Sequence, residues 1–256
     1  MGFFGPRTTA AATSIIPSDV AGLKLWLDAT KGLFDATSGG SAVTADGSAV
    51  ARWEDQSGNG NHLTQATSNN RPVLKTSIQN GKNVIRFDGS NDRLTGGDVL
   101  DLGTDGITIF AVVKITGSNG SVISKSRAAG QDGRWLILRE ADVLYCNFAA
   151  TGSVNRQPQV SSDTTTSFRI ITFSAIRKEA VARINKSVSA TFSVDTTNHN
   201  TTNVLLVGAY PDSSGNEASG IPLNGDIAEI LVYIGDRVSD QNISGLEDYL
   251  AIKWGI

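Results

Sequence analysis

The chain is dominated by short runs in which apolar and polar residues alternate. In the clearest of these runs, Val84, Arg86 and Asp88 alternate with Ile85 and Phe87. A period of two places neighbouring side chains on opposite sides of an extended chain. The run therefore predicts a β-strand with one buried face.

Runs of this kind recur along most of the chain, and 27 glycines supply residues for tight turns between them. A stretch rich in Gly, Ser, Thr and Ala, residues 29–50, is predicted to form a surface loop. Many short strands with little helical periodicity predict an all-β sandwich of two sheets. The predicted strands are residues 23–28, 83–88, 107–115, 121–124, 134–139, 143–148, 168–175, 180–185, 188–192, 203–210 and 227–234.

Helical periodicity is convincing in one place, at the end of the chain. Ser239 is a candidate N-cap, and Gly255 is placed for a C-cap. We expect this helix to pack as a lid on the sandwich, and the strand before it to pair near the first strand. The residues that share its apolar face are Ile243, Leu246, Tyr249, Leu250 and Trp254.

The first eighteen residues show neither a helical nor an alternating period. They carry two apolar pairs, Phe3 with Phe4 and Ile15 with Ile16. We predict an extended N-terminal arm over residues 1–18 and one domain over residues 19–256. The four apolar residues are its predicted assembly contacts on a neighbouring subunit, and a frayed terminus is the alternative.

Composition excludes several classes of protein. The net charge of −3 and the pI of about 5.4 give no electrostatic reason to expect nucleic-acid binding. No apolar run reaches transmembrane length, so we expect no membrane partner. The N-terminus lacks the pattern of a secretory signal peptide. Cys146 is the one cysteine, which rules out an intrachain disulfide, and its apolar surroundings predict a buried thiol.

Two motifs carry a resemblance to a known family. The first is Trp53-x-Asp55-x-Ser-Gly-Asn-Gly-Asn61, followed by Arg71-Pro72. The second begins at Phe87 and reads Phe-Asp-Gly-x-x-Asp-x-Leu. Further support comes from the segments 23–28, 224–233 and 249–255. In this order they resemble the laminin-G-like (LamG/pentraxin-like) branch of the concanavalin A-like lectin/glucanase superfamily, over residues 20–256.

The resemblance implies a two-sheet antiparallel jelly roll, to which this chain adds a C-terminal helix and the N-terminal arm. Some relatives of this kind bind calcium at the rim of the sandwich, and calcium is the one cofactor that we consider. Hard cations need several oxygen ligands in one place. Asp and Asn in turns also cap their own backbone amides, and this is the alternative. The candidate ligands are Asp55, Asn59 and Asn61 in one turn, and Asp88, Asn91 and Asp92 in the other.

Catalysis is not expected. The glucanases of this superfamily carry two catalytic glutamates in the pattern Glu-x-Asp-x-x-Glu, and none of the six glutamates here begins it. Asp226 and Glu229 flank the start of a strand and are predicted to face opposite sides. His62 and His199 lie in polar loops without the motif of a catalytic triad.

Carbohydrate binding is the commonest function that the resemblance implies. Sugar-binding sites combine an exposed aromatic ring with hydrogen bonds from Asp and Asn side chains. Trp135 alternates with Leu136 and is predicted to lie in the core. Tyr210, followed by Asp212 and Asn216 in a polar loop, is the candidate glycan-binding rim.

These observations lead to a functional hypothesis. Chains with this domain and a short arm resemble bacteriophage virion proteins, so we expect a non-catalytic virion subunit: a capsid decoration, fibre or tail-associated protein. Its partners would be other virion subunits in a homo-oligomer, with a cell-surface glycan as a further ligand. The alternatives are a bacterial carbohydrate-binding or adhesion module and, less favoured, a glycoside hydrolase.

Overall fold

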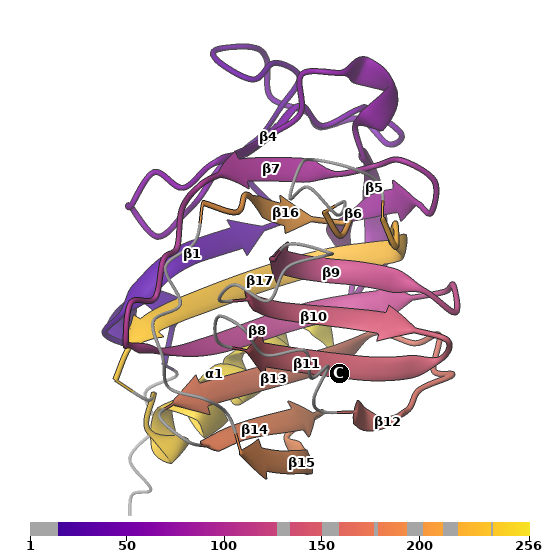
Figure 1. Cartoon of the computed structure of the whole chain (residues 1–256). Helices are drawn as coiled ribbons and strands as arrows, with labels where there is room; N and C mark the ends of the chain where they lie inside the picture. The colour runs from indigo at the N-terminus through magenta and orange to yellow at the C-terminus, as the bar shows by residue number, and fades with distance from the viewer. Residues whose placement is uncertain are drawn as a thin grey trace, which may run out of the picture.

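Two antiparallel β-sheets pack face to face, and a helix covers the outer face of one of them (Figure 1). The structure is a computed structural model that describes residues 15–126, 134–149, 159–176, 179–193, 202–211, 220–236 and 238–256. This arrangement confirms the predicted all-β sandwich with a C-terminal helix. The described residues contain no helix long and apolar enough to cross a membrane.

The sheet that carries the helix, here called sheet A, is built around its longest strand, β17 (Asn224–Gly235). One edge of β17 pairs with β8. The other edge is shared, because β6 pairs with its first residues and β1 with its later ones. The remaining strands of sheet A follow the order β15-β14-β13-β8-β17-β6-β5. Their bounds are β1 Leu23–Asp28, β5 Val73–Gln79, β6 Lys82–Asp88, β8 Gly106–Ile115, β13 Arg169–Ile176, β14 Glu179–Ile184 and β15 Ser187–Ser193.

The second sheet, sheet B, has the order β12-β11-β10-β9-β16-β7-β4-β3-β2. Several of its strands were not predicted, since runs of two to four residues are too short to show a period. The strand expected at residues 203–210 is also shorter than predicted. The bounds are β2 Leu33–Phe34, β3 Arg52–Trp53, β4 Leu63–Thr64, β7 Leu94–Gly97, β9 Gly120–Lys125, β10 Arg134–Glu140, β11 Val143–Ala149, β12 Gln159–Ser162 and β16 Leu205–Val207.

The main core lies between the two sheets. Trp53, Trp135 and Phe87 are buried there, as the alternation predicts for Trp135 and Phe87. Cys146 is also buried in this core, which raises the pKa of its thiol. The prediction of an inaccessible cysteine is therefore confirmed.

A second core lies between sheet A and helix α1 (Asp240–Trp254). The Ser239 hydroxyl accepts a hydrogen bond from the Asn242 amide, and Gly255 adopts a left-handed conformation with φ of 68°. Both predicted caps are thus present. The buried face contains Ile243, Leu246, Leu250 and Trp254, so the predicted lid is confirmed.

The described part of the N-terminal segment already contacts the domain. Ile15 packs against the second core, and the carbonyl of buried Pro17 accepts a hydrogen bond from the Tyr233 hydroxyl. Ile16 instead is 43% exposed. The two members of this predicted assembly pair therefore have different surroundings, while Phe3 and Phe4 lie outside the described residues.

The helix offers a matched pair of substitutions. Leu250 lies on the face of α1 that packs against sheet A and is fully buried, whereas Ile252 on the same helix is 77% exposed. We expect Leu250→Ala to lower the free energy of unfolding by about 2–5 kcal/mol, because it leaves a cavity. Ile252→Ala should change it by less than about 0.5 kcal/mol. Equal unfolding curves for the two variants in denaturant would contradict the packing of α1 on sheet A.

Candidate functional site

Glu229 of β17 has a fully buried side chain that lies at the centre of a polar network. One carboxylate oxygen accepts hydrogen bonds from Trp26 Nε1 (2.7 Å) and the Tyr249 hydroxyl (3.2 Å). The other accepts from Trp254 Nε1 at 2.6 Å and lies 2.8 Å from Lys253 Nζ. Its donors thus come from β1 and from helix α1.

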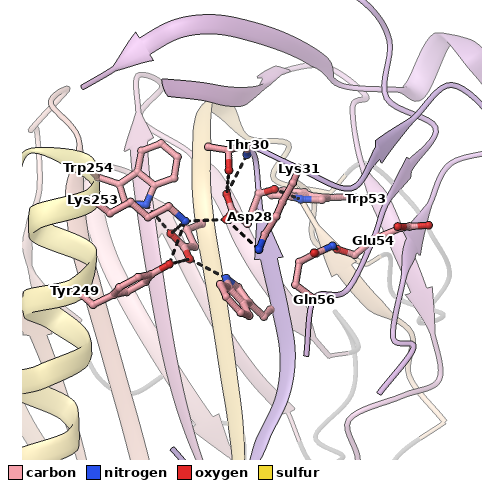
Figure 2. A network of polar contacts seen from close by, with 11 residues as sticks. Asp28, Thr30, Lys31, Trp53, Glu54, Gln56, Tyr249, Lys253 and Trp254 are labelled. Carbon is pink, nitrogen blue, oxygen red and sulfur yellow. Dashed lines mark hydrogen bonds and ion pairs between the residues drawn. The ribbon is translucent and has the colours of Figure 1, made fainter. Parts of the chain in front are cut away.

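Asp28 of β1 extends this network (Figure 2). Lys253 Nζ donates to Asp28 Oδ2 at 2.8 Å, and so joins the two buried carboxylates. Asp28 Oδ1 accepts from the Thr30 amide and hydroxyl at 2.9 and 2.7 Å. The indole of Trp53 donates to the Asp28 carbonyl. The three segments that supported the family resemblance, 23–28, 224–233 and 249–255, therefore meet in one place.

A β-bulge at Ala228 decides where these side chains point. Across β8, Ile227 pairs with Val113 and Glu229 pairs with Val112, so Ala228 is an extra residue. The bulge puts Glu229 on the outer face of sheet A, the same face as Asp226, which binds Arg86 there. The prediction that Asp226 and Glu229 face opposite sides is wrong, because simple alternation does not hold across a bulge.

The network around Glu229 is closed. Four donors already surround its carboxylate. The Lys253 ammonium donates hydrogen bonds to Asp28 and to the Tyr249 hydroxyl and forms an ion pair with Glu229. Burial raises the pKa of Glu229, and the neighbouring Lys253 ammonium opposes this rise. A saturated, buried carboxylate cannot bind a further ligand without losing a partner. We therefore assign this network a structural role.

The first predicted calcium turn closes an edge of β1. Asp55 accepts hydrogen bonds from the backbone amides of Trp26, Ser57 and Asn61. The side-chain amide of Asn59 donates to the Leu23 carbonyl, and that of Asn61 donates to the Lys24 carbonyl. The polar residues of this turn thus satisfy backbone groups of an edge strand.

The second predicted calcium turn caps itself. Asp88 Oδ1 accepts from the amides of Ser90, Asn91 and Asp92, and Asp92 Oδ2 accepts from the Asp88 amide. Within the part of the chain that the structure describes, no group of three His, Cys, Asp or Glu side chains could hold a metal. The hydrogen bonds of both turns favour capping, and calcium binding stays a prediction.

An open polar cleft lies on the outer face of sheet A, where the strands reach the turn that begins at Asp88. Its volume is about 280 Å³. The strand register explains its position: Asp226 of β17 pairs with Arg86 on one side and Lys114 on the other. Asn224 pairs with Asp88, so the cleft adjoins the second predicted calcium turn. The lining residues are Arg86, Lys114, Thr116, Asn224, Gly225 and Asp226, and we call this site the outer cleft.

Strong contacts fix the walls of the outer cleft. Arg86 Nε and Nη2 donate to the two oxygens of Asp226 at 2.6 and 2.9 Å. This bond to Asp226 raises the pKa of Arg86. The Thr116 hydroxyl donates to the side-chain oxygen of Asn224 at 2.8 Å. A Cβ atom at Gly225 would lie 2.1 Å from the Lys114 carbonyl, so the close approach of β17 to β8 requires glycine here.

The predicted glycan rim was expected to present the ring of Tyr210 to solvent, and the structure buries that ring. Tyr210 is 6% exposed and packs with Leu136 and Leu138, while its hydroxyl lies 3.3 Å from that of Ser126. Its ring is therefore not an exposed platform. Asp212 and Asn216 lie outside the described residues. The outer cleft was not predicted, because its residues come together through the pairing of three strands and share no local motif.

Comparisons with known proteins identify the fold alone. No family model and no curated protein matches the chain. A mutant GH54 α-L-arabinofuranosidase, soaked with 4-nitrophenyl α-L-arabinofuranoside, is similar in structure with a TM-score of 0.59 and 13% identity. The binding domain of botulinum neurotoxin serotype D gives 0.59 and 11%. Trypanosoma rangeli sialidase in complex with 2,3-difluorosialic acid gives 0.50 and 11%.

The matched regions cover most of this chain but less of the known proteins. They span 80%, 93% and 90% of this chain for the arabinofuranosidase, the toxin domain and the sialidase. The corresponding shares of those chains are 51%, 55% and 33%. The chain thus shares a sandwich fold with parts of larger proteins, and membership of the laminin-G-like family stays a prediction.

Glu229 can be tested with an isosteric substitution. We expect Glu229→Gln to lower the free energy of unfolding by about 3–5 kcal/mol, because an amide nitrogen cannot accept from the buried donors that converge on it. Glu54→Gln, at a partly exposed ion pair with Arg52, is the control and should cost at most about 1 kcal/mol. A Glu229→Gln protein as stable as the control in denaturant unfolding would refute the closed network.

The raised pKa of Asp92 predicts that the stability of the protein depends on pH. Burial and the nearby Asp88 carboxylate raise its pKa to about 7. Between the ordinary Asp pKa near 4 and about 7, the folded protein retains a proton that the unfolded chain has lost. The contribution of Asp92 to stability should therefore be greatest below about pH 4 and be lost as the pH rises through 7.

Asp92→Asn should remove this fall and raise stability at pH 8 by about 1–3 kcal/mol, measured by unfolding at a series of pH values. The same variant tests calcium. If Asp92 binds the ion, the wild type gains stability from added calcium and the variant does not. If the stability difference between Asp92→Asn and the wild type, measured without calcium, stays the same from pH 5 to pH 8, the raised pKa is contradicted.

Proposed function

We propose that this protein is a non-catalytic glycan-binding β-sandwich and that the outer cleft holds the glycan. The observation that carries the proposal is the composition of the outer cleft: an amide, a hydroxyl and two cationic side chains line a surface hollow on paired strands. Sites on strands hold their groups more firmly than sites on loops, which lowers the entropy lost on binding.

The side chains of the outer cleft suit a polyhydroxylated ligand. Each sugar hydroxyl is both a donor and an acceptor of hydrogen bonds. Asn224 offers both kinds of group, and Lys114 and Arg86 offer donors. The hydroxyl of Thr116 orients the side chain of Asn224 through their 2.8 Å hydrogen bond. The described lining contains no aromatic ring, so hydrogen bonds would provide most of the specificity.

Hydrolysis is not proposed, although Asp226 and Glu229 share the outer face. A glycosidase needs one carboxyl group that protonates the leaving group and a second one free to attack or to activate water. Glu229 is surrounded by four donors, and both oxygens of Asp226 are bound to Arg86. This observation supports a binding role.

Known proteins of similar fold support the choice of ligand class. Two of them, the arabinofuranosidase and the sialidase, are named as enzymes that act on carbohydrates. Because the chain spans only about half and one third of these proteins, their reactions are not carried over to it. The role as a virion subunit in a homo-oligomer, with the bacterial adhesion module as its alternative, stays a sequence-based hypothesis about where the sandwich is used.

The test is binding of the purified full chain to a broad glycan array, followed by calorimetry on the best glycans. Thr116→Val and Asn224→Ala should each weaken binding by roughly 5–50-fold, the range expected for losing one or two hydrogen bonds. Thr191→Val, at an exposed site on the distant strand β15, is the control and should leave affinity unchanged. No binding on the array, or wild-type affinity in both cleft variants, would refute the proposal.

A further inference from the structure

We propose that the outer cleft selects glycans that carry a negatively charged group, a carboxylate or a sulfate, and that Lys114 is the residue that recognises it. This inference rests on the proposed glycan-binding function and names the class of glycan. It follows from three features of the outer cleft: the order of charges across the strands, their unequal exposure, and the absence of a described partner for Lys114.

The charges form a row across three neighbouring strands. Asp226 of β17 stands between Arg86 of β6 and Lys114 of β8, and the strand register pairs it with both. Arg86 binds both oxygens of Asp226, whereas Lys114 forms no ion pair with any described residue. The carboxylate is thus committed to one of its two cationic neighbours.

Exposure decides which charge a ligand meets. The Asp226 side chain is 2% exposed, while that of Arg86 is 42% exposed. Lys114 is also partly exposed. A ligand entering the outer cleft therefore meets a guanidinium edge and an ammonium group, with the carboxylate buried beneath them. This local positive charge contrasts with the net charge of −3 of the whole chain.

The nearby carboxylates are already bonded to other groups. Asp46, the other carboxylate that acts on Arg86, is paired with Lys75. Asp88 directs an oxygen to the amides of its own turn. An anionic group in the outer cleft would therefore gain charge-assisted hydrogen bonds, which are about twice as strong as those between neutral groups. Hydroxyls of the same sugar would reach Asn224 and Thr116 on the neighbouring positions.

A solvated surface lysine is the competing explanation, because charged side chains on exposed sheets also discourage aggregation. In that case Lys114 would have no effect on ligand choice. Lys114→Met separates the two explanations, since methionine keeps much of the aliphatic stem and removes the charge. Because Lys114 has no described ion-pair partner, we expect the melting temperature to stay unchanged. Lys24→Met on β1 is the matched control at an exposed lysine away from the outer cleft.

The experiment compares three glycans of equal length by calorimetry with the full chain: a galacturonate oligosaccharide, its methyl ester, and a sulfated galactose oligosaccharide. We expect the acidic forms to bind at least 10-fold more tightly than the ester, and the acid and the sulfate together identify which anion is preferred. Lys114→Met should lower the affinity for the preferred acidic form by about 10–100-fold and leave the ester within 2-fold. Raising the salt from about 0.05 to about 0.5 M should weaken acid binding by the wild type far more than by the variant.

The outcomes separate this inference from the proposed function. If the array and these titrations show binding of neutral glycans alone, glycan binding stands and the inference about charge is wrong. If no glycan binds, the proposed function itself fails. If acidic glycans bind equally well to Lys114→Met and Lys24→Met, another surface recognises the charge and Lys114 is excluded.

Discussion

The structure depends on one buried carboxylate. Glu229 receives hydrogen bonds from Trp26 near the start of the domain and from Tyr249 and Trp254 at its end. A buried charge is costly unless every lone pair has a donor, and this requirement fixes the relative positions of β1, β17 and α1. The bulge at Ala228 makes the network possible, because it turns Glu229 toward the helix. The two ends of the domain are thus joined through a side chain of the last strand.

The edge of β1 shows how the turn motif contributes. Among the described strands β1 pairs with β17 alone, so in this part of the chain its other edge has no neighbouring strand. An open edge exposes unpaired amides and carbonyls. The residues from Asp55 to Asn61 occupy this edge and bind the backbone at Leu23, Lys24 and Trp26. The side chains that suggested a cation site therefore take the place of a neighbouring strand: Asp55 accepts from the backbone of β1, and the amide nitrogens of Asn59 and Asn61 donate to it.

The outer face of sheet A divides into a covered part and an open part. Helix α1 buries the apolar residues of this face, such as Phe110 and Leu231. The outer cleft begins where this apolar surface ends, at Arg86, Lys114 and Asp226. The same strand, β17, thus supplies Glu229 to a closed network and Asp226 to an open hollow. Both residues are carboxylates on the same face, and they differ in their position relative to helix α1. Glu229 is bound by α1, whereas Asp226 lines the outer cleft.

The sequence alone determined the features that depend on local periodicity and capping. The long alternating strands, the caps at Ser239 and Gly255, and the apolar face of α1 follow from spacing along the chain, and the structure contains them. Tertiary structure decided which polar side chains meet. A bulge reverses the alternation at Glu229, and strand register brings Arg86, Lys114 and Asp226 together from three separate segments. Such contacts depend on pairing between distant strands, which single-chain periodicity does not encode.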